Sequence, residues 1–306
     1  MHPKISILMN CYNGEAYLRE ALDSVFQQSF TDWQLVFVDN CSTDSSFSIL
    51  SDYNQEKVKY IKTDKNVLLG EARNLGIKHC LGTFISFLDC DDVYYPDALQ
   101  KAYDLISSSN CILAYGGHDN INSKGEIIGK HQTQKNDGDL FSKLLLQYDI
   151  PIVSTIVSRS LLGKSCLNFD SNIVASEEYC LFMQLAAKYK IISTEEILLK
   201  YRIHDNALTN GSISKWGAER RYTLDKIVSE NPHINKRYHR ELQLAYARSF
   251  YYDAQYFMSL GERKLAKLCL SKSKYLNFKY FLLYILVFFP YPIWQSIQKI
   301  KYKRNL

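Results

Sequence analysis

The chain has 306 residues, a length that exceeds a typical single α/β domain and allows a sizeable core. Its eight cysteines form no C-x-x-C pair and have no metal-ligand spacing, a pattern typical of free thiols in a reducing cytosol. The formal net charge is +5, yet residues 263–306 hold ten Lys or Arg and no Asp or Glu. The excess positive charge therefore lies in the tail. No nucleic-acid-binding motif accompanies it, so we predict no nucleic-acid partner.

Three short apolar runs, at 5–9, 35–38 and 84–88, predict strands, and each is followed by a stretch with helical periodicity. Repeated units of this kind predict an α/β fold with a mostly parallel sheet flanked by helices. Ligands of such sheets bind beyond the carboxyl ends of the strands. We therefore expect one crevice to be lined by the polar residues that follow the three runs, namely Asn13, Asp39 and the acidic cluster 89–92.

Three carboxylates, Asp89, Asp91 and Asp92, lie within four positions after the third run. Like charges so close together stay ionised near neutral pH only beside a cation, and their hard oxygen atoms suit Mg²⁺ or Mn²⁺. The alternative is a solvated acidic turn. The chain has neither G-x-G-x-x-G nor a P-loop, so no backbone phosphate cradle is encoded. A bound nucleotide would then need Tyr12 against the base, Asp39 on the base or ribose, and a metal on the diphosphate.

Five groups of residues spread over about two thirds of the chain carry further information. They are an opening strand with a Tyr-Asn turn, a Val-Asp signature, an Ala-Arg-Asn segment followed by a DxD motif, a Glu-Glu pair and a Tyr-Arg-Ile-His segment. In chain order they occupy residues 5–13, 38–44, 70–76 with 88–92, 176–179 and 201–204. Together they resemble the motifs of a family 2 glycosyltransferase of the GT-A fold, over residues 4 to about 206.

The resemblance implies a site for a nucleotide-diphospho-sugar donor and a divalent metal. It implies that Asp91 and Asp92, with Asp89 and His204 beside them, hold Mg²⁺ or Mn²⁺ on the diphosphate. Taken alone, His204 lies in a polar loop and is equally explained as a solvated side chain. The resemblance also implies which residues contact the donor nucleotide: Asn10, Tyr12, Asn13, Asp39, Arg73 and Asp89.

The resemblance implies that Glu178 is the catalytic base, with Glu177 as the alternative. The family usually has Asp at this position, so the base is one methylene longer here. Taken alone, the two glutamates follow Ser176 and are also explained as first-turn acids that complement a helix dipole. A second departure is Asn40-Cys41, which replaces the usual Asp-Gly, so the turn there must tolerate a Cβ atom.

The chain changes character after residue 206. Residues 206–214 predict a linker, and 222–258 and 262–276 predict helices that are separated at Gly261. We therefore divide the chain into a catalytic GT-A domain at 1–206, a helical appendage at 207–276 and an apolar, basic tail at 277–306.

The tail contains a fifteen-residue aromatic and aliphatic run, 280–294, followed by Lys299, Lys301, Lys303 and Arg304. This run is short for a bilayer span, which takes about 20 apolar residues, and two prolines interrupt it. Aromatic anchors with cationic flanks favour an interfacial segment on anionic lipid. The alternative is a C-terminal helix packed on the catalytic domain.

Together with the resemblance, these patterns predict a metal-dependent glycosyltransferase that moves a sugar from a nucleotide-diphosphate donor to a lipid-linked or surface-polysaccharide acceptor. The resemblance implies that the transfer inverts the configuration. Because the first strand begins at Ile5, we expect no signal peptide and a cytoplasmic protein, peripheral on the inner face of the cell membrane. The alternative function is a catalytically silent nucleotide-sugar-binding or scaffolding protein, because Asn40 and Glu178 depart from the family pattern.

Overall fold

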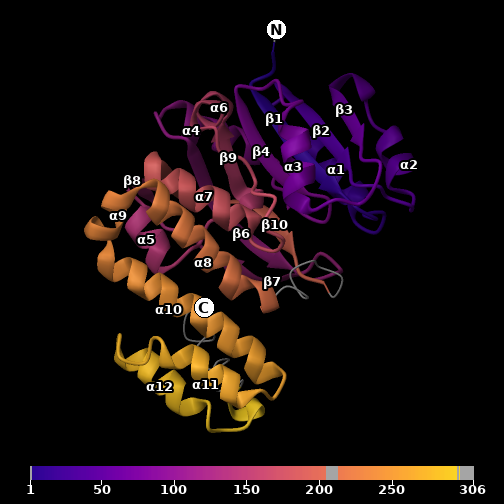
Figure 1. Cartoon of the computed structure of the whole chain (residues 1–306). Coiled ribbons are helices and arrows are strands. Elements are labelled where there is room, and N and C mark those ends of the chain that lie inside the picture. The colour runs from indigo at the N-terminus through magenta and orange to yellow at the C-terminus, as the bar shows by residue number, and fades with distance from the viewer. Residues whose placement is uncertain (1, 205–212, 295, 297–306) are drawn as a thin grey trace. The chain divides into compact units, whose positions relative to one another are not determined.

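The computed structural model describes residues 2–204, 213–294 and 296 (Figure 1). Most of the predicted linker 206–214 and the terminal basic residues Lys299, Lys301, Lys303 and Arg304 lie outside the described residues. The chain divides into an α/β unit, Met1–Leu140 with Asp149–Asp205, and a helical unit, Phe141–Tyr148 with Asn206–Leu306. The domain division at residues 206 and 276 stays a prediction.

Four adjacent parallel strands form the half of the sheet that holds the predicted donor residues. In the order β3-β2-β1-β4 they are β1 (Ile5–Cys11), β2 (Trp33–Asp39), β3 (Val58–Lys62) and β4 (Phe84–Asp89). Every side chain of β1 is buried, as expected for a strand covered on both faces. Cys11 pairs with Asp39, and Asn10 pairs with Asp89, so the carboxyl ends of these strands meet at one edge.

The other half of the sheet is mixed. β9 (Thr155–Ser158) is antiparallel to both β4 and β6 (Leu113–Ile121), and β6 is parallel to the long strand β10 (Ile191–Arg202). The remaining strands are short and antiparallel to their neighbours: β5 (Val93–Tyr94) and β8 (Asn136–Gly138) on β10, and β7 (Ile127–His131) on β6. Because β10 ends beside the acidic cluster, it brings residues 201–204 to the predicted crevice.

Helices cover the two faces of the parallel half of the sheet, as Figure 1 shows for α1 and α3. α1 (Leu18–Phe26) buries its apolar stripe with Ile5 and Ile7 of β1. α3 (Leu69–Ile77) lies against the opposite face, where a Cβ atom at Gly76 would collide with Leu8. The remaining helices of this unit are α2 (Ser46–Ser51), α4 (Ala98–Ser107), α6 (Arg159–Ser165), α7 (Glu177–Lys188) and 3-10 turns at Gln55–Lys57 and Ile152–Ser154. The predicted α/β fold with a mostly parallel sheet flanked by helices is confirmed.

The helical unit consists of α5 (Phe141–Leu146), α8 (Ile213–Glu230), α9 (Pro232–Arg237), α10 (His239–Ser259), α11 (Arg263–Ser271) and α12 (Phe278–Leu286). The break at Gly261 is present, with a φ of 78° that suits glycine. The continuous helix predicted over 222–258 is wrong, because the chain is interrupted between α8 and α10. Pro232, which has no N–H to continue a helix, begins the short helix α9 there.

The aromatic run of the tail has two different faces. Tyr280, Leu283, Val287 and Trp294 are buried in a core shared with α10 and α11. The other face is exposed and holds Phe278, Phe281, Leu282, Ile285, Phe288 and Phe289. Among the described residues no helix combines the length and the apolar character that crossing a bilayer requires.

Candidate active site

The loops after β1 and β2 are joined by reciprocal hydrogen bonds. The Asn13 Oδ1 atom accepts a bond from the Thr43 N–H at 2.9 Å, and the Asn13 N–H donates to Ser42 Oγ at 3.0 Å. Two residues further on, the Glu15 N–H donates to Asp44 Oδ2 at 2.9 Å. Asn13 is therefore used to shape the loop, whereas Tyr12 exposes 51% of its surface at the same edge of the sheet.

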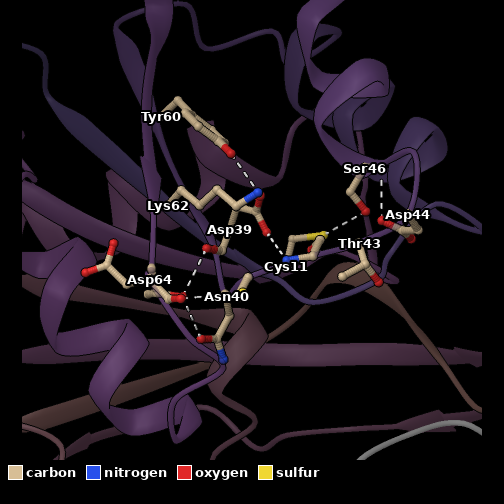
Figure 2. Close-up of polar contacts among 12 residues, drawn as sticks. Cys11, Asp39, Asn40, Thr43, Asp44, Ser46, Tyr60, Lys62 and Asp64 are labelled. Carbon is tan, nitrogen blue, oxygen red and sulfur yellow. Dashed lines mark hydrogen bonds and ion pairs between the residues drawn. The ribbon is translucent and has the colours of Figure 1, made fainter.

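Asp39 ends β2 with a carboxylate that is 1% exposed (Figure 2). Its Oδ1 atom accepts the Ser42 N–H at 2.7 Å and its Oδ2 atom accepts the Tyr60 hydroxyl at 2.8 Å. Burial and this hydrogen bond to Asp39 raise the pKa of the Tyr60 phenol. Both carboxylate oxygens thus have partners within the protein, and contact between Asp39 and a nucleobase stays a prediction.

Asn40 and Cys41 show why this departure from the family pattern is tolerated. The Asn40 amide donates to the Val67 carbonyl at 2.8 Å and accepts the Val67 N–H at 2.9 Å. A carboxylate could not make the first of these bonds, so the amide ties β2 to the loop before α3. Cys41 has a φ of 67°, in the left-handed region that favours glycine. Cys41 therefore has a backbone conformation typical of glycine although it carries a Cβ atom.

The three carboxylates of the acidic cluster have different surroundings. Asp91 Oδ2 lies 2.9 Å from Nε2 of His204, so β10 brings these two predicted metal ligands together. Asp92 is fully buried, and its Oδ1 atom accepts the Arg202 N–H at 2.8 Å. Its Oδ2 atom has no hydrogen-bond partner among the described residues. Burial, and then the neighbouring Asp91 and Asp89 charges, raise the pKa of Asp92 well above its ordinary value.

Arg202 is a structural residue of the site to which the sequence analysis gave no role of its own. Its buried guanidinium donates from Nε to the Asp91 carbonyl at 2.9 Å and forms an ion pair with Glu20. The guanidinium carbon also lies 4.6 Å from the centroid of the Tyr17 ring. Arg202 therefore fastens the acidic cluster to the end of β10 and to α1. The sequence feature that could have identified Arg202 is its position between Tyr201 and His204 in the fifth motif.

Arg73 joins two elements of the site that are far apart in the sequence. From α3, its Nη1 atom lies 2.6 Å from Glu177 Oε1 and its Nη2 atom lies 3.3 Å from Asp89 Oδ1. Arg73 is 2% exposed and Glu177 is 5% exposed, whereas the Asp89 side chain is 32% exposed, so a buried ion pair extends to one partly exposed acid. Desolvation raises the pKa of Asp89. The positive charge of Arg73 opposes this shift, and the negative charge of Asp91 adds to it.

The structure distinguishes the two candidate bases at the start of α7. Glu177 is committed to the ion pair with Arg73. Glu178 is only partly buried, and its charge contributes to the raised pKa of Tyr201 after burial and the three aspartates. Glu178 therefore lies near the acidic cluster and is more exposed than Glu177. Its role as the base stays a prediction.

The residues present fit a divalent metal only in part. No group of three or more His, Cys, Asp or Glu side chains that could hold a metal ion occurs in the part of the chain that the structure describes. The pair Asp91 and His204 nevertheless offers a carboxylate oxygen and an imidazole nitrogen side by side. Mg²⁺ at nucleotide sites commonly takes one or two carboxylates and completes its coordination with phosphate and water oxygens.

Asn10 adds a polar atom at the same edge of the sheet. It lies beside Asp89 in the strand register and is 7% exposed. Its Oδ1 atom is buried and has no hydrogen-bond partner within residues 2–204, 213–294 and 296. Buried acceptors of this kind normally have a partner. Contact between Asn10 and the donor nucleotide stays a prediction.

Several known proteins are similar to this chain, and three of them have informative descriptions. WfgD of Escherichia coli, a UDP-Glc:alpha-D-GlcNAc-diphosphoundecaprenol beta-1,3-glucosyltransferase, is 25% identical over 230 residues, which cover 74% of this chain and 87% of WfgD. The crystal structure of S. aureus TarS 1-349 with UDP-GlcNAc has a TM-score of 0.64 at 19% identity and 88% coverage of each chain. The mannosyltransferase PcManGT from Pyrobaculum calidifontis, in complex with GDP-Man and Mn²⁺, has a TM-score of 0.62 at 14% identity, covering 98% of this chain and 85% of PcManGT.

The structural similarity supports the GT-A fold. This chain also matches uncharacterized glycosyltransferases from Rickettsia felis and Rickettsia conorii, at 27% and 29% identity. The match spans only 38% and 33% of the length of these two relatives. The family model described as "Glycosyl transferase family 2" matches residues 6–163, more than half of the sequence and the part that contains β1, β2, the DxD motif and Arg73. The chain belongs to glycosyl transferase family 2.

Proposed function

We propose that the chain is a metal-dependent, inverting glycosyltransferase that takes a sugar from a nucleotide-diphosphate donor. The observation that carries this proposal is the Arg73 bridge. It joins Asp89 at the end of β4 to the buried Glu177 at the start of α7. Glu178 is the next residue along α7, so a base is held beside the acidic cluster at the edge where parallel strands bind ligands.

Glu178 accepts the proton of the acceptor hydroxyl as the hydroxyl oxygen attacks the anomeric carbon of the donor sugar. The bond from that carbon to the diphosphate breaks on the opposite face, which inverts the configuration. A general base typically contributes about 10² to 10⁴ in rate. Arg73 and Glu177 are positioning residues, because their ion pair fixes the first turn of α7 and with it Glu178.

Asp91 and His204 hold Mg²⁺ or Mn²⁺ in this proposal, with Asp89 beside them. When bound, the ion would neutralise part of the negative charge on the diphosphate leaving group. The Mn²⁺ in the PcManGT complex supports the choice of a divalent ion. Asp92 is fully buried and bonded to the Arg202 main chain, so we assign it to the support of the loop that carries Asp91.

The donor nucleotide lies at the carboxyl ends of β1 and β2 in this proposal. Tyr12 provides an exposed ring for the base, and Asn10 provides the buried Oδ1 acceptor. TarS was crystallised with UDP-GlcNAc and PcManGT with GDP-Man, which supports a nucleotide-diphospho-sugar without selecting the nucleotide. The name of WfgD includes a diphosphoundecaprenol acceptor, which supports a lipid-linked or polysaccharide acceptor.

Thermal unfolding in the presence of nucleotide sugars tests the donor assignment. UDP-, GDP-, dTDP- and CMP-linked sugars should be compared with Mn²⁺ and with EDTA, because a ligand that binds only the folded chain raises its melting temperature. At least one donor should stabilise the chain only with Mn²⁺, and the same mixture should release free nucleotide when an acceptor is added. Metal-dependent binding without turnover would instead identify a silent nucleotide-sugar-binding protein.

We propose that the exposed face of α12 and the turn after it binds anionic lipid. Phe278 is 73% exposed, and Phe281, Phe288 and Phe289 extend this apolar surface. Lys267 lies 4.7 Å from the centroid of the Phe288 ring, so cationic groups border the aromatic surface. This combination matches an interfacial helix, which buries aromatic side chains at the level of the lipid headgroups. The acceptor would then be reached at the inner face of the cell membrane.

Point variants are a sharper test of this surface than truncation after Leu276, which would remove core residues such as Tyr280 and Trp294. The triple variant Phe278→Ser, Phe281→Ser, Phe288→Ser should lose flotation with liposomes that contain phosphatidylglycerol and keep its melting temperature. Ile127→Ser, at an exposed apolar residue of β7, is the matched control. Equal flotation of the triple variant and the control would contradict the membrane assignment.

A further inference from the structure

Two cysteines occupy neighbouring positions at the edge of the sheet that carries the site. Asn10 of β1 is paired with Asp89 of β4 in a parallel register. The next residue after Asn10 is Cys11, and the next residue after Asp89 is Cys90. Neighbouring strands lie about 4.8 Å apart, and disulfides join residues whose Cα atoms are roughly 4.4–6.8 Å apart. The register therefore places this pair within the range of a disulfide.

The two sulfur atoms also approach each other. A Cβ atom built on Gly14 would lie 2.7 Å from the Cys11 Sγ atom and 2.9 Å from the Cys90 Sγ atom, so both thiols fill the space beside this glycine. Cys11 Sγ also lies 3.5 Å from the Ser46 hydroxyl oxygen (Figure 2). Neither Cys11 nor Cys90 is part of a disulfide in this structure.

The proposed mechanism uses neither thiol, although Cys90 is the central residue of the Asp89-Cys90-Asp91 motif. We propose that Cys11 and Cys90 form a reversible disulfide that disrupts binding of the metal and the nucleotide. The bond draws the two sulfur atoms to a separation of about 2.05 Å and ties Cys90 to Cys11. Asp89 and Asp91 flank Cys90 directly, so we expect this tie to change how their carboxylates meet Arg73 and His204.

The oxidant is a low-molecular-weight disulfide. Cys90 is partly buried whereas Cys11 is fully buried, so the reagent meets Cys90 first. The Cys90 thiol gives up its proton as its sulfur attacks one sulfur of the reagent, and the other reagent half leaves as a thiolate. The Cys11 sulfur then attacks Cys90 Sγ and releases the second reagent half. The two protein thiols lose two protons and two electrons, the two reagent halves gain them as thiols, and dithiothreitol reverses the reaction.

Peptide mapping of the full chain tests the chemistry without reference to the function. The protein is treated with oxidised glutathione, blocked with iodoacetamide and digested without reduction. We expect a peptide pair linked through Cys11 and Cys90 that disappears after dithiothreitol. Cys166, which is exposed, should carry glutathione and shows that the reagent reacted, whereas the buried Cys80 should stay alkylatable after unfolding. Modified Cys166 without the linked pair would overturn the proposal.

The second measurement concerns the consequence and rests on the proposed function. Oxidised wild-type protein should bind UDP or GDP with Mn²⁺ roughly tenfold more weakly than reduced protein, because displacements of about 1 Å are costly at such sites. The Cys90→Ala variant, compared with and without oxidant, should show no redox dependence. Equal nucleotide binding by linked and reduced protein would also overturn the proposal. If the reduced protein binds neither UDP nor GDP, the donor assignment is refuted. The peptide linked through Cys11 and Cys90 would then still show whether the disulfide forms.

Discussion

The buried bridge at Arg73 gives the sharpest prediction about stability. Arg73→Met keeps most of the side-chain volume and removes the charge, so Asp89 and Glu177 lose their shared cation. Arg73 is 2% exposed and lies 2.6 Å from Glu177, which is 5% exposed, so little water is available to solvate Glu177 once the cation is removed. Asp89, at 3.3 Å from Arg73, is 32% exposed and keeps part of its hydration. Removal of one partner from a buried ion pair costs about 3–5 kcal/mol. We expect a loss of this size in the free energy of unfolding at pH 7.

Urea unfolding of the full chain, monitored by circular dichroism, measures this loss. Arg19→Met is the matched control, because Arg19 also forms an ion pair, with Asp52 at 2.8 Å, but both side chains are more than half exposed. An exposed pair contributes little, so this control should unfold near the wild-type midpoint. Glu177→Gln added to Arg73→Met should recover part of the loss, because it removes one of the uncompensated acids. If Arg73→Met unfolds at the same urea concentration as the control, the network does not stabilise the fold and the argument for Glu177 as a positioning residue fails.

Three of the four strands of the parallel half could be predicted from local patterns, because each of the three is an apolar run that ends in polar residues, whereas β3 was not predicted. The apolar runs of β1, β2 and β4 and the helices after them are visible in the sequence, and parallel pairing brings their ends together. The prediction that the Asn40-Cys41 turn must tolerate a Cβ atom also followed from local chemistry. The φ of 67° at Cys41 agrees with it.

The contacts between side chains of the site could not be predicted, because they join residues that are far apart in the chain. Arg73 and Glu177 are 104 positions apart, Asp91 and His204 are 113 apart, and the ion pair of Arg202 with Glu20 spans 182. No periodicity links such positions. The last two pairs meet because β10 runs parallel to β6 and ends beside the acidic cluster, and the first pair joins α3 to α7. These are features of topology and not of composition.

The tail shows a different limit of sequence reasoning. Both faces of α12 are apolar, so hydropathy does not separate the buried Tyr280 and Leu283 from the exposed Phe278 and Phe281. The buried face packs within the helical unit, and the interfacial segment stays a prediction. One face packs on α10 and α11, and the other remains exposed.

Three further predictions concern the site and the pH dependence of stability. Asp91→Asn should abolish Mn²⁺-dependent stabilisation by nucleotide sugars at an unchanged melting temperature of the ligand-free protein, and retained stabilisation would remove Asp91 from the metal site. Glu178→Gln should lower turnover by about 10² to 10⁴ with donor affinity nearly intact; if Glu177→Gln alone has this effect, the two roles are exchanged. Burial, and then the neighbouring His131, lower the pKa of His118 to about 4 from the usual 6.5. Between these values the unfolded chain binds a proton at this residue that the folded chain does not, so stability is greatest above pH 6.5 and falls as the pH drops toward 4. The full difference amounts to roughly 3 kcal/mol. Urea unfolding of wild type and His118→Gln at pH 7.5 and pH 4.5 measures it, since the variant lacks the titrating group and should lose less stability on acidification. Equal losses in the two proteins would show that the His118 ring is solvated and that its packing against His131 is not maintained in solution.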